Sequence, residues 1–160
     1  MSLSAAIKAL SGSQTRYVRY VGTAGELVNA AVINIFQIVG GDIRVNAFYG
    51  VCMADSDGSA TTLQPRIIPT GGAQQVLALA CTTLAAATIN DTLAPTGAVG
   101  VAMVIETTMG VTAGNMGTNE WILLPGIVNI LVGGATDALQ FYDWVMGYVP
   151  LAPGANVVAL

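Results

Sequence analysis

The chain of 160 residues contains no histidine and only two cysteines. The absence of histidine excludes Ser-His-Asp and Cys-His nucleophilic sites, histidine-bound metals and acid–base catalysis by imidazole. Cys52 and Cys81 are too few and too far apart for a zinc motif, and both lie in apolar runs. We therefore expect buried free thiols, with a disulfide as the open alternative. No other base–nucleophile pair can be named, so we predict a protein that is not an enzyme and that uses no cofactor, metal or small-molecule substrate.

Charge is also scarce, because charged residues make up 9% of the chain against about 25% in typical soluble domains. Hydrophobic residues make up 54%. Too few charges remain to cover the surface, so we expect an exterior of Thr, Asn, Ser, Gln and Gly that is partly buried in an assembly. The basic residues all precede residue 67: Lys8, Arg16, Arg19, Arg44 and Arg66. They form no cluster that could neutralise several phosphates, which argues against binding of nucleic acid.

Long hydrophobic runs are missing as well. A membrane-spanning helix needs about 20 mainly apolar residues. The best candidate, residues 121–135, is shorter and is interrupted by Pro125, Gly126 and Asn129. We therefore expect no interaction with a membrane.

The pattern that is present is period-two alternation. Residues 43–53, 99–106 and 139–148 alternate as antiparallel strands do, and the third run is bulky on both faces, so both faces should be covered. Residues 29–39 and 126–132 are apolar without alternation, which predicts strands buried on both faces. In the first run the predicted inward residues are Ile43, Val45, Ala47, Tyr49, Val51 and Met53.

One segment has conflicting preferences. In residues 73–90, Ala and Leu favour helix whereas Thr and Val favour strand. We predict a strand there. Gly, Asn and Pro punctuate the chain at intervals of about 8–12 residues, which is typical of a sandwich or a barrel. The sequence thus predicts an all-β fold, either an antiparallel β-sandwich or a jelly-roll-like barrel, formed by one domain over residues 14–160.

A short helical or extended arm over residues 1–13 is predicted to precede this domain. Leu3, Ile7 and Leu10 form one apolar stripe on it, too short to be stable alone, so we expect it to contact a partner. The C-terminal segment ends on apolar residues and should dock as an edge strand, in its own sheet or a neighbour's. Because Pro150 and Pro153 lack backbone donors, the chain through residues 149–153 should run extended along an edge. The predicted assembly residues are Leu3, Ile7, Leu10, Val157, Val158 and Leu160.

An acidic stretch and a row of aromatic residues could each be either a binding site or an ordinary part of the fold. The acidic stretch at residues 55–59 lacks the downstream ligands of a calcium loop, so a solvated turn is the better interpretation. Tyr142, Trp144 and Tyr148 share one strand face and could form a platform for sugars if exposed. A stripe of core residues is the commoner explanation.

Three stretches carry a resemblance: "IVGGDIRVNAFYGV", "LLPGIVNILVGGATDALQFYDWVMGYVPL" and the ending "GANVVAL". In these the chain resembles small β-rich structural proteins of tailed bacteriophage virions, which are capsid decoration (cement) proteins, head fibres or tail components. The resemblance implies an oligomeric decoration protein of the virion that stabilises a phage shell. Its expected partners are copies of itself, as a homotrimer, and a major capsid protein or other virion protein. The alternative is a glycan- or receptor-binding β-module of a phage tail or head fibre.

Overall fold

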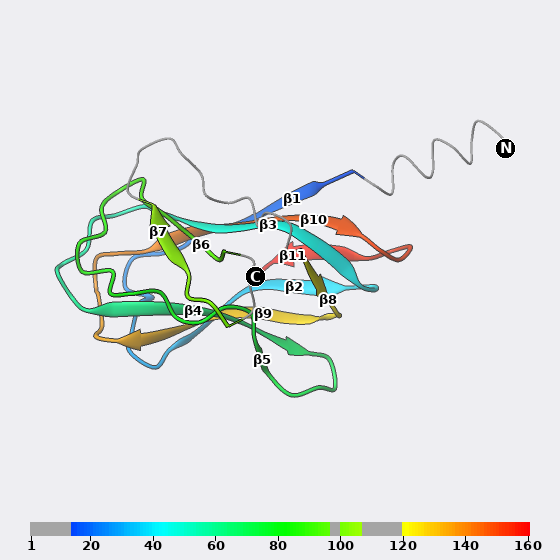
Figure 1. Ribbon diagram of the computed structural model, residues 1–160, viewed down its shortest axis with the longest axis horizontal. Coiled ribbons are helices and arrows are strands. Elements are labelled where there is room, and N and C mark those ends of the chain that lie inside the picture. The colour runs from blue at the N-terminus through cyan, green and yellow to red at the C-terminus, as the bar shows by residue number, and fades with distance from the viewer. Residues whose placement is uncertain (1–13, 97–99, 107–119) are drawn as a thin grey trace, which may run out of the picture.

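The computed structural model describes residues 14–96, 100–106 and 120–160, and the regular structure in this part of the chain is β-strand throughout (Figure 1). Two sheets pack face to face, and every strand pair in them is antiparallel, which confirms the predicted all-β sandwich. One sheet holds β1 (Arg16–Tyr20), β10 (Tyr142–Pro150), β3 (Ile43–Cys52), β6 (Thr92–Ala94) and β7 (Val104–Glu106), and β8 (Trp121–Leu123) also pairs with β3. The five-stranded sheet holds β11 (Asn156–Ala159), β2 (Val32–Val39), β9 (Gly126–Gly134), β4 (Thr61–Pro69) and β5 (Gln75–Val76).

The order of pairing is nested along the chain. β1 pairs with β10, β2 with β9, β3 with β6 and β4 with β5, and the first four strands alternate between the two sheets. This is the wrapping order of a jelly roll. β7 and β8 extend one sheet and β11 extends the other. In the described part of the chain no helix has the length and apolar character needed to cross a membrane.

The core between the sheets is centred on Phe48 of β3. Its ring lies 5.4 Å from that of Trp144, 5.6 Å from that of Trp121 and 6.5 Å from that of Phe36, measured between centroids. Phe36 comes from β2 in the opposite sheet, so this cluster joins the two layers. Aromatic pairs at such distances add stabilisation beyond the area that they bury.

A β-bulge in β3 inverts the faces predicted for this strand. Val45 and Ala47 oppose consecutive residues of β10, so Asn46 is an extra residue that has no opposed residue in β10. Beyond the bulge the even-numbered residues from Phe48 onward are the buried ones. The inward placement predicted for Ala47, Tyr49 and Val51 is therefore wrong, and Met53 lies beyond the strand and is half-buried.

Other predicted strands are confirmed in part. Both faces of β10 are covered, and β9 is buried or half-buried over the whole predicted run. β2 differs, because its outward residues Val32 and Val39 are exposed, so only its inner face is buried. Of the described part of the 99–106 run, only Val104–Glu106 forms a strand, and residues 97–99 lie outside the described residues.

The strand predicted over residues 73–90 is limited to Gln75–Val76. The following chain is irregular but runs along β4, donating from the backbone N–H groups of Leu77, Cys81 and Leu84 to three carbonyl groups of β4 over 2.9–3.1 Å. These hydrogen bonds occupy acceptors that β4 would otherwise leave open at its edge. Local preference could not show this, because the segment is shaped by a strand that is distant in sequence.

The C-terminal segment forms β11, which pairs with β2 at the edge of the five-stranded sheet. Val157 points into the core and is 5% exposed. The extended path predicted for residues 149–153 is wrong: Pro150 ends β10, and the turn that follows is closed by a 3.1 Å hydrogen bond from the Ala155 N–H to the Ala152 carbonyl. This turn carries the chain from one sheet to the other.

We expect removal of residues 156–160 to lower the free energy of unfolding by at least about 1.5–3 kcal/mol, the value of burying a side chain such as Val157. Urea unfolding of the shortened chain measures the loss. Val158→Thr is the matched control, because it keeps β11 and changes an exposed side chain, so its effect should stay within about 0.5 kcal/mol. Equal stability of the shortened and full chains would contradict a structural role for β11.

Candidate functional site

The outward side chains of the five-stranded sheet form a continuous surface, which we call the outer face. Directly opposed residues of antiparallel strands lie on the same face, so the register defines its rows. The first row is Val158, Gln37, Ile127 and Ile68, the second is Asn34, Asn129, Arg66 and Val76, and the third is Val32, Leu131 and Gln64.

The outer face is almost without charge. Arg66 is the single charged residue in the five strands of this sheet. The rest of the three rows is aliphatic or carries a neutral amide, and several aliphatic side chains are exposed: Val32, Ile68, Val76 and Val158. A sheet face that meets water is ordinarily polar, whereas a contiguous apolar surface marks a site of interaction.

Arg66 lies in the middle row and is 8% exposed. Its Nε donates a 3.3 Å hydrogen bond to Oδ1 of Asn129. Within the described residues no carboxylate lies at ion-pair distance from the guanidinium. Asn129 is fully buried, and its Nδ2 has no hydrogen-bond partner. The outer face therefore has an incompletely satisfied polar pair at its centre.

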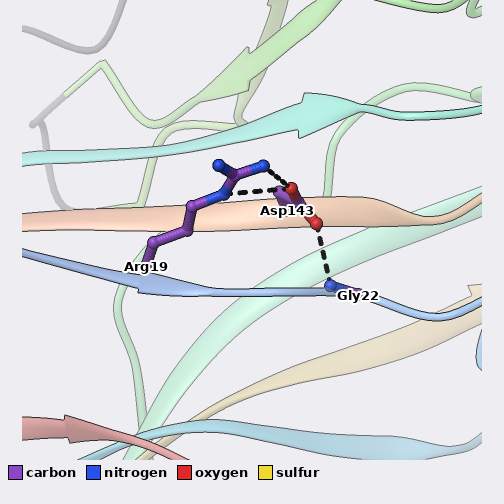
Figure 2. A network of polar contacts seen from close by, with 3 residues as sticks. All are labelled: Arg19, Gly22 and Asp143. Atoms are coloured by element: carbon purple, nitrogen blue, oxygen red, sulfur yellow. Dashed lines mark hydrogen bonds and ion pairs between the residues drawn. The ribbon is translucent and has the colours of Figure 1, made fainter.

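In the opposite sheet, two arginine side chains have carboxylate counter-ions. Asp143 of β10 is 2% exposed and accepts from Arg19 of β1, with which it forms an ion pair, and from the backbone N–H of Gly22 at 2.9 Å (Figure 2). Arg44 of β3 lies 3.3 Å from a carboxylate oxygen of Glu120. In contrast to Arg19 and Arg44, the buried Arg66 has no counter-ion among the residues that the structure describes.

The predicted assembly residues fall in different environments. Val158 belongs to the outer face, and Leu160 directly follows β11 and is 52% exposed. Val157 faces the core instead, so its side chain is not available to a partner. Leu3, Ile7 and Leu10 lie outside the described residues.

The sequence did not single out Arg66 as a site residue. The only signal was one basic residue within the apolar run "TTLQPRIIP". Its neighbour Asn129 is 63 positions away along the chain, so the pair is recognisable only when the register of β4 and β9 is known.

The aromatic stripe is part of the core. Tyr142, Trp144 and Tyr148 are all buried, so the exposed platform for sugars does not form.

Cys52 and Cys81 are buried free thiols, as expected. Burial raises the pKa of both thiols, which keeps them protonated and unreactive near neutral pH.

The acidic stretch at residues 55–59 is a turn. Ser56 Oγ and the Asp57 N–H both donate to Oδ2 of Asp137, at 2.7 and 3.1 Å. In residues 14–96, 100–106 and 120–160, no group of three or more Cys, Asp or Glu side chains is placed to hold a metal ion.

Comparison with known proteins finds no matching family model, no similar curated protein and no similar solved structure. What the protein does must therefore be inferred from its own residues. The outer face, with its exposed aliphatic side chains and a single charged residue in five strands, is the surface from which we infer it.

Proposed function

We propose that the chain is a structural protein of a virus particle, an oligomeric capsid decoration protein that stabilises a phage shell. The observation that carries the proposal is the scarcity of charge on the outer face, since Arg66 is the single charged residue in its five strands. Obligate interfaces between subunits are more apolar than ordinary surfaces, and their centres are depleted of charge. A shell component gains stability by burying such a surface on its neighbours. Its partners are copies of itself, as a homotrimer, and a major capsid protein.

The resemblance of three stretches to phage virion proteins supports the same assignment. The alternative, a glycan- or receptor-binding module, was motivated by Tyr142, Trp144 and Tyr148. Because all three are buried, they offer no platform for a sugar ring. No other feature of the described residues favours a glycan- or receptor-binding module.

Virus particles purified on a density gradient from cells that carry the gene should contain this chain in many copies at a fixed ratio to the major capsid protein. Quantitative mass spectrometry of the particles measures that ratio. An abundant host enzyme, followed through the same gradient, controls for carry-over. A chain that is depleted from the particles to the level of the host enzyme would refute the virion assignment, whatever its oligomeric state.

A further inference from the structure

Arg66 is a nearly desolvated cation at the centre of the outer face. A guanidinium has five N–H donors, and among the described residues only that of Nε has a hydrogen-bond partner. Its neighbours in the middle row are the neutral Asn129 and the aliphatic Val76. Buried polar groups in native proteins are nearly always satisfied, so the buried Nδ2 of Asn129, which lacks a hydrogen-bond partner among the described residues, needs an explanation.

Covering the outer face with another apolar surface would remove the remaining water from Arg66. Burying a charge without a counter-ion costs several kcal/mol. A surface that covers this face must therefore bring an acceptor to the guanidinium. The planar fork of arginine fits a carboxylate, which can accept two parallel N–H donors.

A symmetric contact between two outer faces does not meet this requirement. It would bring two Arg66 side chains into one interface, and none of the five strands carries an acid. The acids of the chain lie elsewhere, and they outnumber its basic residues by nine to five. Within the described residues, Asp42 and Glu106 are both half-exposed, and neither forms a hydrogen bond or ion pair through its side chain.

We propose that the outer face binds a second copy of this chain in a head-to-tail arrangement, in which a carboxylate from another surface of that copy pairs with Arg66. The contact joins two different surfaces, so repeated copies close into a ring when the rotation between them allows it. The inference rests on the proposed function, because it supplies the contact through which the homotrimer forms. It also explains why Arg66 has no counter-ion within the described part of a single chain.

Sedimentation equilibrium tests this contact with the variant Arg66→Met, which keeps an unbranched apolar side chain and removes the charge. We expect the wild-type chain to self-associate and Arg66→Met to raise its dissociation constant at least about 30-fold, since losing one partner of a buried charge pair costs 2 kcal/mol or more. Arg66→Lys keeps the charge without the fork and should be intermediate. Arg16→Met is the matched control, because Arg16 is exposed at the start of β1 and forms no ion pair in the described structure.

Circular dichroism of the variants separates a docking role from a structural one. At a concentration low enough for both chains to be monomeric, Arg66→Met should fold with a Tm close to that of the wild type. The lost hydrogen bond to Asn129 is offset by the removal of a desolvated cation. The proposal is overturned if the wild type stays monomeric up to about 0.1 mM, which would make a different protein the occupant of the face. It is also overturned if Arg66→Met associates as the wild type does, or if it fails to fold. A chain that is abundant in virus particles but insensitive to Arg66→Met would refute this inference alone.

Discussion

Replacing Asp137 with alanine should lower the free energy of unfolding by about 3–5 kcal/mol, because it removes a charged acceptor of four hydrogen bonds. Asp137 is fully buried, and both of its oxygens are used. Oδ2 accepts from the 55–59 turn, and Oδ1 accepts from the backbone N–H groups of Leu139 and Gln140 at 3.0 and 2.9 Å. Its own N–H donates to the Leu27 carbonyl at 3.0 Å. The carboxylate thus joins the segments that precede β4 and β10, and the backbone of the same residue contacts the segment that precedes β2.

Alanine would leave four donors without this acceptor. Only the contact from the Gln140 N–H is fully buried, and a buried unsatisfied group costs about 1–3 kcal/mol, whereas the other three contacts are partly buried. Urea unfolding of the variant and the wild type measures the difference. Asp55→Ala is the control: Asp55 is exposed and accepts one backbone hydrogen bond, from Ile89, so we expect a loss of about 1 kcal/mol. Similar losses for the two variants would show that the Asp137 carboxylate does not hold together the segments that precede β4 and β10.

The same site makes stability depend on pH. Burial alone would raise the pKa of Asp137, but the hydrogen bonds from Gln140, Ser56, Leu139 and Asp57 outweigh it and hold the pKa below the usual range. A depressed carboxyl pKa stabilises the fold above the pKa of the unfolded chain, about 3.9, and this contribution disappears as the pH falls through the folded value. The stability difference between the wild type and Asp137→Asn should therefore shrink below about pH 4. A constant difference from neutral pH into the acid range would contradict the depressed pKa.

Phe48→Ala should lower the free energy of unfolding by about 3–5 kcal/mol, the usual range for removing a buried phenylalanine ring. The ring is fully buried and contacts aromatic rings from both sheets, so its removal leaves a cavity where the layers meet. The adjacent Tyr49 lies on the other face of β3 and is half-buried. Tyr49→Ala is therefore the matched control, and we expect it to cost about 1 kcal/mol.

This pair of variants also tests the β-bulge at Asn46. With strict alternation from Ile43, Tyr49 would face the core and Phe48 the solvent. Urea unfolding under identical conditions ranks the two losses. A larger loss for Tyr49→Ala than for Phe48→Ala would contradict the shift in register between β3 and β10.

How much of this fold could be predicted depends on the range of the interaction concerned. Turns and most strands follow from local chemistry, because Gly, Pro and Asn set the corners and period-two runs set the strands. The bulges at Asn46 and Ile35 could not be found in this way. One inserted residue inverts a strand's faces, and β3 is apolar enough on both sides to accept either arrangement.

The candidate site was even less accessible from sequence. Val158 and Leu160 were singled out because an apolar chain end is unusual, and both are exposed in the structure. Arg66 is recognisable as a site residue only from its neighbours, Asn129 in β9 and Val76 in β5, and from the absence of an acid on any strand of the five-stranded sheet. Neither condition is visible along one strand.

The nested pairing order has a consequence for how the protein reaches this structure. β1 pairs with β10, which begins at Tyr142, so during synthesis β1 cannot pair until more than a hundred further residues have been made. Closing such long loops is entropically costly before any contact repays it, and chains dominated by distant pairings fold over about milliseconds to seconds. During synthesis, the edges of β1 and β2 stay open to other nascent chains until β9 and β10 have emerged. Because charge is scarce in the sequence, we expect the unfinished chain to be prone to aggregate.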